Sequence, residues 1–217
     1  MTATPANTKA AIIQAAGELF ASHGFGSVTA RQVAKAADVA LSAIPYHFGS
    51  MANLYQKTLL QACEISPQAV PLAKRAFEAP PEQGIRLAIE WAMEDYAGMQ
   101  VAWPMRLITR EELDPSPIFP EVIERKFAPE WNWLSQIVGR ASGREPASPA
   151  VKFGVVTLYT LALSTLVHRA VLAKLAPDVL QTERAALIET IARLTLDAVE
   201  RYATATSSSS SSVSDRA

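Results

Sequence analysis

Histidine and acidic side chains are the groups in this sequence that could carry out catalysis or bind a metal ion. The three histidines, His23, His47 and His168, are far apart along the chain. None belongs to a Glu-x-x-His or His-x-x-x-His pair, the spacing that places two ligands on one helix face. We therefore expect no cofactor, no metal site and no enzyme activity. A small all-α enzyme is the alternative, using His168 with acids from the set Glu94, Asp95, Glu111 and Glu112.

A second set of side chains could read DNA. Two short helical segments, residues 30–37 and 41–47, are separated by only three residues, as in a helix-turn-helix motif. In that motif the second helix lies in the major groove, with its N-terminal residues nearest the base edges. Here those residues are Leu41, Ser42 and Ala43. Ser42 can donate a hydrogen bond to a base or phosphate, and Ala43 can contact a thymine methyl group.

Local signals define the helices that position this motif. An amphipathic helix over residues 8–23 precedes it, and Thr29 and Gln32 have the spacing of a capping box. Val28 and Val33 occupy the two positions of a hydrophobic staple. The turn between the motif's helices begins at an aspartate, Asp38, a residue type that tolerates positive φ.

Pro45 indicates where the second helix begins. Proline lacks an N–H and breaks the hydrogen-bond ladder inside a helix, but not in its first turn. If Ser42 is the N-cap, Pro45 falls in that first turn. We therefore predict a short or late-starting recognition helix, which an unbroken ladder from Ala40 through residue 45 would contradict. Ser50 is the expected cap of the next helix.

Seven of the chain's 16 aromatic residues, including all four tryptophans, lie between residues 91 and 133. Aromatic walls with a few fixed polar groups are typical of small-molecule pockets. Ordinary helical core, with the arginines paired to nearby glutamates, is the alternative. For a pocket that binds a small-molecule effector, the candidate residues are Trp91, Trp103, Arg106, Arg110, Phe127 and Trp131.

The remaining chain predicts further helices and no strand. Prolines mark the boundaries of helices near 68–78, 82–99, 104–113, 119–139, 150–174 and 182–203. The prediction is an all-α fold of about nine helices. The last two are apolar over more than one face, which suggests a homodimer built through a four-helix bundle.

Composition places the protein among intracellular globular chains. With one cysteine, Cys63, no internal disulfide is possible, and the N-terminus has no signal-peptide pattern. The uncharged stretch 153–167 is too short for a membrane span. We expect a cytoplasmic protein without membrane contact. We also expect a DNA-binding domain over 1–60, an effector-binding and dimerisation domain over 61–206, and a disordered serine-rich tail over 207–217.

The helix-turn-helix segment resembles the DNA-binding domain of the TetR family of bacterial regulators. The resemblance spans about residues 8–60, and the matching positions are in unbroken register: Thr29, Val33, Ala34, Ala37, Val39, Ile44, Tyr46, His47, Phe48, Ser50 and Leu54. It implies that Tyr46 and His47 reach backbone phosphates and that Thr29 and Arg31 support the other flank. The family commonly has Lys after the position of Ser50. This chain has Met51 there, which removes one phosphate contact.

A second segment is similar to the R-E-x-x-x-P-S-P pattern of an AcrR/CecR-like subset of that family. The matching residues are Arg110, Glu111, Pro115, Ser116 and Pro117. The family resemblance implies a repressor released from a palindromic operator by a small-molecule effector. The helix from Ser50 to about Ile65 joins the two domains, so we expect it to carry the motion by which effector binding reaches the DNA-binding domain. A ligand-independent DNA-binding regulator is the alternative.

The formal charge of −1, from 20 basic and 21 acidic side chains, is unevenly distributed. Residues 1–60 have a charge of +2, from Lys9, Arg31, Lys35 and Lys57 against Glu18 and Asp38, and the rest has −3. A small basic excess predicts weak non-specific binding and a modest dependence of DNA affinity on salt, because few counterions are released.

Overall fold

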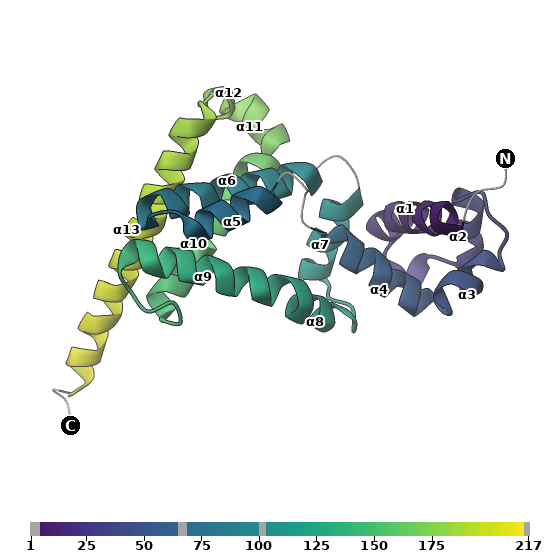
Figure 1. The fold of residues 1–217 in the computed structure, drawn as a ribbon, viewed down its shortest axis with the longest axis horizontal. Coiled ribbons are helices and arrows are strands. Elements are labelled where there is room, and N and C mark those ends of the chain that lie inside the picture. The colour runs from purple at the N-terminus through teal and green to yellow at the C-terminus, as the bar shows by residue number, and fades with distance from the viewer. Residues whose placement is uncertain (1–4, 65–68, 100–102, 215–217) are drawn as a thin grey trace. The chain divides into compact units, whose positions relative to one another are not determined.

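The structure is a computed structural model that describes residues 5–64, 69–99 and 103–214 (Figure 1). These ranges contain helices and no strand, which confirms the all-α prediction. A short 3-10 helix, η1 (Phe25–Ser27), and a π-helical segment, η2 (Ile123–Phe127), accompany the α-helices. The α-helices are α1 (Pro5–His23), α2 (Ala30–Ala36), α3 (Ala43–Phe48), α4 (Met51–Ala62), α5 (Val70–Glu78), α6 (Pro81–Met99), α7 (Trp103–Leu113), α8 (Phe119–Val122), α9 (Ala128–Ser142), α10 (Pro149–Val167), α11 (Arg169–Leu175), α12 (Pro177–Leu180) and α13 (Arg184–Ser214).

The described residues form more helices than the nine or so that were predicted, because two predicted long helices are divided and α12 lies outside every predicted range. The segment 119–139 consists of α8, η2 and the start of α9. The segment 150–174 breaks at His168, which has φ −95° and ψ 12°. Apolar spacing does not distinguish a π turn from an α turn, and no glycine or proline marks the break at His168. Hydrophobic periodicity alone therefore predicts one helix in each case.

Two compact units make up the chain. The N-terminal unit is Met1–Glu64 with Met99–Phe127, and the C-terminal unit is Ile65–Gly98 with Ala128–Ala217. The DNA-binding domain expected over residues 1–60 does not include residues 99–127, which pack with the N-terminal unit. They do so because α7 packs against both α1 and α4. Side chains buried in the core of the N-terminal unit include Ile12, Phe20, Val33, Ile44, Leu54, Leu59, Trp103 and Leu107.

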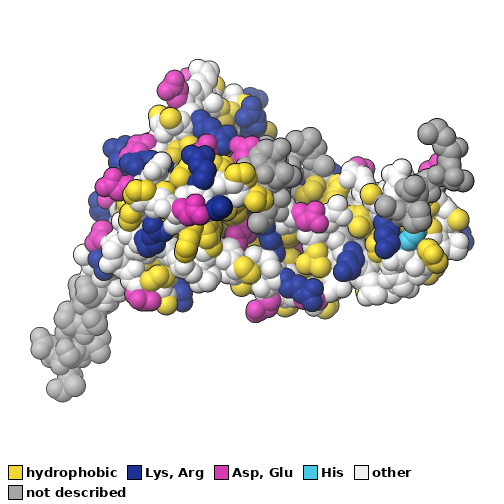
Figure 2. Space-filling view, viewed as in Figure 1, with side chains coloured by type: hydrophobic (Ala, Val, Ile, Leu, Met, Phe, Trp, Pro, Cys, Tyr) yellow, Lys and Arg dark blue, Asp and Glu magenta, His cyan; other side chains and the backbone are white. Residues whose placement is uncertain are grey.

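The C-terminal unit is organised around α10. This helix packs against α13 and α9, and Gly154 permits the close approach of α13. A Cβ at Gly154 would lie 2.4 Å from Val199 Cγ2. On the face drawn in Figure 2, basic and acidic side chains are mixed over the surface of this unit.

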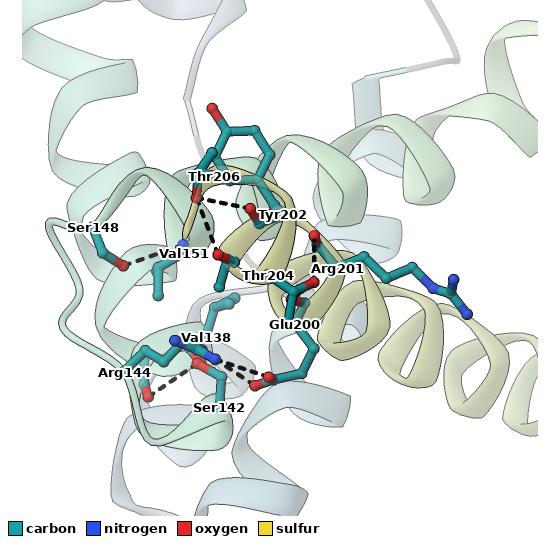
Figure 3. A network of polar contacts seen from close by, with 12 residues as sticks. Val138, Ser142, Arg144, Ser148, Val151, Glu200, Arg201, Tyr202, Thr204 and Thr206 are labelled. Carbon is teal, nitrogen blue, oxygen red and sulfur yellow. Dashed lines mark hydrogen bonds and ion pairs between the residues drawn. The ribbon is translucent and has the colours of Figure 1, made fainter. Parts of the chain in front are cut away.

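One surface network joins the α9–α10 loop to α13 (Figure 3). Arg144 in the loop donates two hydrogen bonds to the carboxylate of Glu200, with N···O distances of 3.2 and 2.8 Å. Ser148 Oγ accepts from the N–H of Val151 at 3.4 Å, near the start of α10. The Arg144–Glu200 pair holds the loop against α13, and the Ser148 bond joins the loop to the start of α10.

α13 extends to Ser214 and so includes the whole serine run, residues 207–212, of the tail over 207–217 that composition predicts to be disordered. Extending an existing helix adds one hydrogen bond per ordered residue, which costs far less than nucleating a new helix.

Across the described ranges, no single helix has the length and apolar character needed to cross a membrane. The bent pair Pro149–Ser164 and Arg169–Leu175, with 68° between its halves, meets those criteria only when the halves are combined.

Candidate nucleic-acid interface

The start of α2 is fixed by the predicted capping box. Thr29 Oγ1 accepts from the Gln32 N–H at 3.3 Å, and the Thr29 N–H donates to Gln32 Oε1 at 2.8 Å. The Thr29 hydroxyl also donates to Gln32 Oε1 at 2.8 Å, so its proton is already engaged. Val28 and Val33 are both buried in the same apolar cluster, as a staple requires.

The connection from α2 to α3 is a tight turn. Asp38 has φ 53°, the positive value predicted for this position. The N–H of Val39 donates to the carbonyl of Ala34 at 3.0 Å. Because Val39 packs partly against the core cluster, the direction in which the chain enters α3 is defined by both backbone and side chain.

The predicted late start of the recognition helix is confirmed. α3 begins at Ala43, with Ser42 as its N-cap residue, and Pro45 lies in its first turn. Its first i to i−4 bond runs from the Tyr46 N–H to the Ser42 carbonyl at 3.2 Å. The helix ends after Phe48 at Gly49, whose φ of 76° lies in a region that glycine adopts without strain.

α3 presents one face to solvent and anchors the other in the core. Ile44 is 1% exposed, whereas Leu41 is 48% exposed and Tyr46 is 83% exposed. The rings of Tyr46 and His47 lie edge to face, with centroids 4.9 Å apart. Ser42 is exposed and makes no side-chain capping bond, so its hydroxyl remains available to a ligand. Five of the predicted DNA-binding residues thus lie at this edge: Leu41, Ser42, Ala43, Tyr46 and His47.

A hollow of about 500 Å³ lies beside the start of α3. We call it the α3 hollow. No titratable side chain lines it. It brings together the first residue of α2, the first part of α3 and the start of α4, and its lining residues are Ala30, Leu41, Ser42, Ile44, Pro45, Gly49, Ser50 and Met51.

α4 begins beside this hollow and contributes Tyr55 to a buried polar network. Ser50 caps it, accepting from the Asn53 N–H at 3.1 Å through Oγ, as predicted. Further along α4, the buried Tyr55 hydroxyl donates to Glu111 of α7. Burial raises the pKa of the Tyr55 phenol above its usual range, and the bond to Glu111 adds to this effect.

Glu111 is the centre of that network, which we call the Glu111 clasp (Tyr55, Glu111 and Ser116). The Glu111 side chain is 2% exposed. Besides the Tyr55 hydroxyl, its carboxylate accepts the Ser116 hydroxyl at 2.8 Å and the Ser116 N–H at 3.2 Å. The R-E-x-x-x-P-S-P pattern therefore ties the α7–α8 connection to α4. The sequence pattern marked Glu111 and Ser116, but nothing in the sequence indicated Tyr55 as their partner.

Arg110, the neighbour of Glu111, has a different environment. Its guanidinium lies against Gly24 at the end of α1, where a Cβ would approach Arg110 Nη2 to 2.7 Å. Gly24 also has φ 77°, so the position favours glycine on two grounds. Of the predicted pocket residues, Arg106 and Arg110 are exposed on α7.

The structure places the aromatic pocket candidates in both units. In the N-terminal unit, Trp103 is buried between α7 and α1 and donates to Gln14 Oε1 at 2.9 Å, and Phe127 packs on Phe119. In the C-terminal unit, Trp91 is buried against Trp133, with centroids 4.8 Å apart. Trp131 stacks on Tyr159 at 6.3 Å.

The fold and the exposed second helix of the motif define a helix-turn-helix DNA-binding protein. The family model for "Bacterial regulatory proteins, tetR family" matches residues 12–58. A second model, "HTH-type transcriptional dual regulator CecR, C-terminal domain", matches residues 81–199, which is more than half of the chain. The chain belongs to the TetR family of bacterial transcriptional regulators. Among curated protein sequences, none matches it.

Solved structures of regulators have the same fold. A HlyIIR mutant with an internal segment replaced by a linker aligns with a TM-score of 0.64 and 15% identity, over 85% of this chain and 96% of its own. The fatty acid degradation regulator FadR from Bacillus halodurans aligns with a TM-score of 0.60 and 16% identity, over 90% and 97%. A TerR/AcrR-family regulator from Aquifex aeolicus gives 0.55 and 15%, over 86% and 96%. At these identities the likeness shows the fold alone.

Proposed function

We propose that this protein is a transcriptional repressor that binds a palindromic operator as a homodimer and leaves it when a small-molecule effector binds. The observation that carries this proposal is the exposed edge of α3. Its outward side chains are held in place by the buried Ile44 and by capped helices on either side. A rigid, solvent-facing helix start is what major-groove reading requires.

Each predicted DNA contact has a role consistent with its surroundings. Ser42 has a hydroxyl without a capping partner and is suited to a base or phosphate contact. Tyr46 and His47 follow Ser42 along α3 and are suited to contact the phosphates of the DNA backbone. Thr29 already donates its proton to Gln32, so its part is to hold α2 in place. Arg31, exposed on α2, then supplies the charged contact on that flank.

The proposed homodimer uses α10 and α13. These helices pack against each other, yet both still expose large apolar side chains: Val156 on α10 is 46% exposed and Leu194 on α13 is 45% exposed. A second copy related by two-fold symmetry would cover these faces in a four-helix bundle. Sedimentation at micromolar concentration should give a dimer. Val156→Arg should give a monomer, and Val179→Arg, at an exposed site on α12, should not.

We place the effector in the C-terminal unit, beside Trp91 and Trp131. Trp91 Nε1 is buried and has no hydrogen-bond partner among the described residues. A buried indole N–H without an acceptor is costly and is suited to a ligand oxygen. Among the similar folds is a regulator named for fatty acid degradation, so fatty acids are the first effectors to test. If saturating effector left operator affinity unchanged, release by effector would be wrong.

Selection of bound sequences from random DNA tests the proposed DNA-reading function directly. We expect an enriched palindrome whose half-sites lie about one helical turn apart, or a multiple of it. The affinity should depend only modestly on salt, because the basic excess over residues 1–60 is +2. A slope that implied about ten released counterions would contradict this picture.

A ligand-independent DNA-binding regulator is the second candidate. It accounts for the same α3 edge and explains the aromatic residues as core, as the burial of Trp91 and Trp103 also allows. Native mass spectrometry of the purified protein separates the two cases. A co-purified small molecule supports the effector model, and an operator-bound protein that no candidate effector releases supports the alternative.

A further inference from the structure

The reading edge of α3 lacks the side chains that usually identify purines. Bidentate hydrogen bonds from Arg or Lys to guanine, and from Asn or Gln to adenine, are the commonest specific base contacts. From Val39 through Ala52 the sequence contains no Arg, Lys, Asn, Gln, Asp or Glu. Base selection by the N-terminal part of α3 therefore has to use short hydroxyl or apolar contacts.

The α3 hollow supplies the apolar contacts. Leu41 and Pro45 are exposed beside it, and Met51 forms part of its wall from α4. Met51 is also the residue that stands where the family commonly has lysine. The same position thus loses a phosphate contact and gains apolar surface next to the recognition helix.

One apolar group lies on the base edges of the major groove, the C5 methyl of thymine. The charge around the hollow fits a nucleic acid: no acidic side chain lines it, and Arg31, Lys35 and Lys57 are exposed on the two helices beside α3. We infer that the chain selects its operator by placing thymine methyl groups of the major groove in the α3 hollow, against Leu41, Pro45 and Met51. This inference rests on the proposed DNA-reading function.

Uracil substitution tests the inference, because it removes the methyl group and leaves the pairing and hydrogen-bonding edge of the base unchanged. In the operator selected from random DNA, each thymine is replaced singly by deoxyuridine, and the affinity of the full-length protein is measured by fluorescence anisotropy. Burying one methyl group contributes roughly a fourfold change in affinity. We expect about fourfold weaker binding at one or two thymines of each half-site and no change at the others.

Two protein variants then show whether the methyl is read by contact. Leu41→Ala removes exposed apolar surface at the hollow and should reduce the uracil penalty at the same positions. Leu113→Ala is the matched control, because Leu113 is 82% exposed and lies on α7; it should leave the penalty intact. Circular dichroism establishes that both variants are folded.

The outcomes separate this inference from the function on which it rests. If random DNA yields no enriched sequence, the proposed DNA-reading function is wrong and this inference falls with it. If an operator is enriched but every thymine tolerates uracil, only the methyl readout is wrong. A uracil penalty that is the same in wild type and in Leu41→Ala would mean that DNA shape is read instead, which also overturns the inference.

Discussion

The polar contacts that join helices differ between the two units of this chain, although Asp95 in the C-terminal unit is also buried. In the N-terminal unit, the Glu111 clasp holds a buried carboxylate that accepts hydrogen bonds from Tyr55 and Ser116. In the C-terminal unit, ion pairs such as Arg184 with Glu94, at 3.0 Å, lie partly in solvent. A buried polar network permits only one arrangement of its helices, because any other leaves polar groups unpaired. Apolar packing with surface pairs is more tolerant of rearrangement.

This contrast agrees with the proposed roles of the two units, DNA reading in the N-terminal unit and effector binding and dimerisation in the C-terminal unit. A unit that reads DNA needs one geometry for α3, whereas a unit that binds an effector and a second copy needs surfaces that can shift. The clasp joins α7 to α4, so α7 and the connection to α8 belong mechanically with the DNA-reading helices. In this arrangement, motion of α4 also moves α7.

The largest expected effect comes from opening the clasp. Glu111→Ala leaves the buried Tyr55 hydroxyl and the half-buried Ser116 hydroxyl without their acceptor. Breaking a buried charged network by removing one partner typically costs about 3 kcal/mol or more. We therefore expect the free energy of unfolding, measured by urea denaturation, to fall by about 3 kcal/mol.

Glu124→Ala is the matched control, since Glu124 is exposed in η2 of the same unit. Exposed substitutions of this kind usually change stability by less than about 0.5 kcal/mol. Equal effects of the two substitutions would remove the contrast between the units, because the clasp would then contribute no more than a surface carboxylate.

Steric contact between α1 and α7 should give the second largest effect. A Cβ at Gly17 would lie 2.2–2.5 Å from ring atoms of Trp103. Gly17→Ala forces the indole or α7 to move, and overpacking of this kind costs about 1–3 kcal/mol. Gly26→Ala is the control, because a Cβ there meets no atom within 4 Å. Thermal unfolding of both variants checks the expectation, and a neutral Gly17→Ala would contradict the tight α1–α7 packing.

The sequence predicted those parts of the fold whose causes are local. The capping box at Thr29, the positive φ of Asp38 and the late start of α3 each depend on a few neighbouring residues. Residue type alone indicates such features, because the partner atoms are close along the chain. The helix boundaries near prolines follow for the same reason.

Features that depend on distant partners were not predictable. Tyr55 and Glu111 are 56 positions apart, and no periodic pattern connects them. The π-helical segment η2 and the break at His168 carry no glycine signal, so residue types near them did not indicate either feature. The aromatic cluster shows the same limit, because proximity in sequence between Trp91 and Trp103 did not place them in one unit.

Removing the cap of α2 tests how much this local hydrogen bond contributes to the stability of the unit that carries α3. Thr29→Ala deletes the hydroxyl that accepts the Gln32 N–H, and losing such a cap costs about 1 kcal/mol. Thr29→Ser keeps the hydroxyl and should be nearly neutral. Urea denaturation gives the stability change. A loss of 3 kcal/mol would place the cap on the same level as the clasp and contradict the proposed ordering.

The smallest effect is expected in the C-terminal unit, at the pair formed by Arg184 of α13 and Glu94 of α6. Both side chains are partly in solvent, at 47% and 32% exposure, so water and salt screen their attraction. A double-mutant cycle with Arg184→Ala and Glu94→Ala should give a coupling of about 0.2–1 kcal/mol, reduced further at high salt. A salt-resistant coupling as large as that of the Glu111 clasp would mean that the C-terminal unit is also held by specific polar contacts. Effector-driven rearrangement would then have to break them.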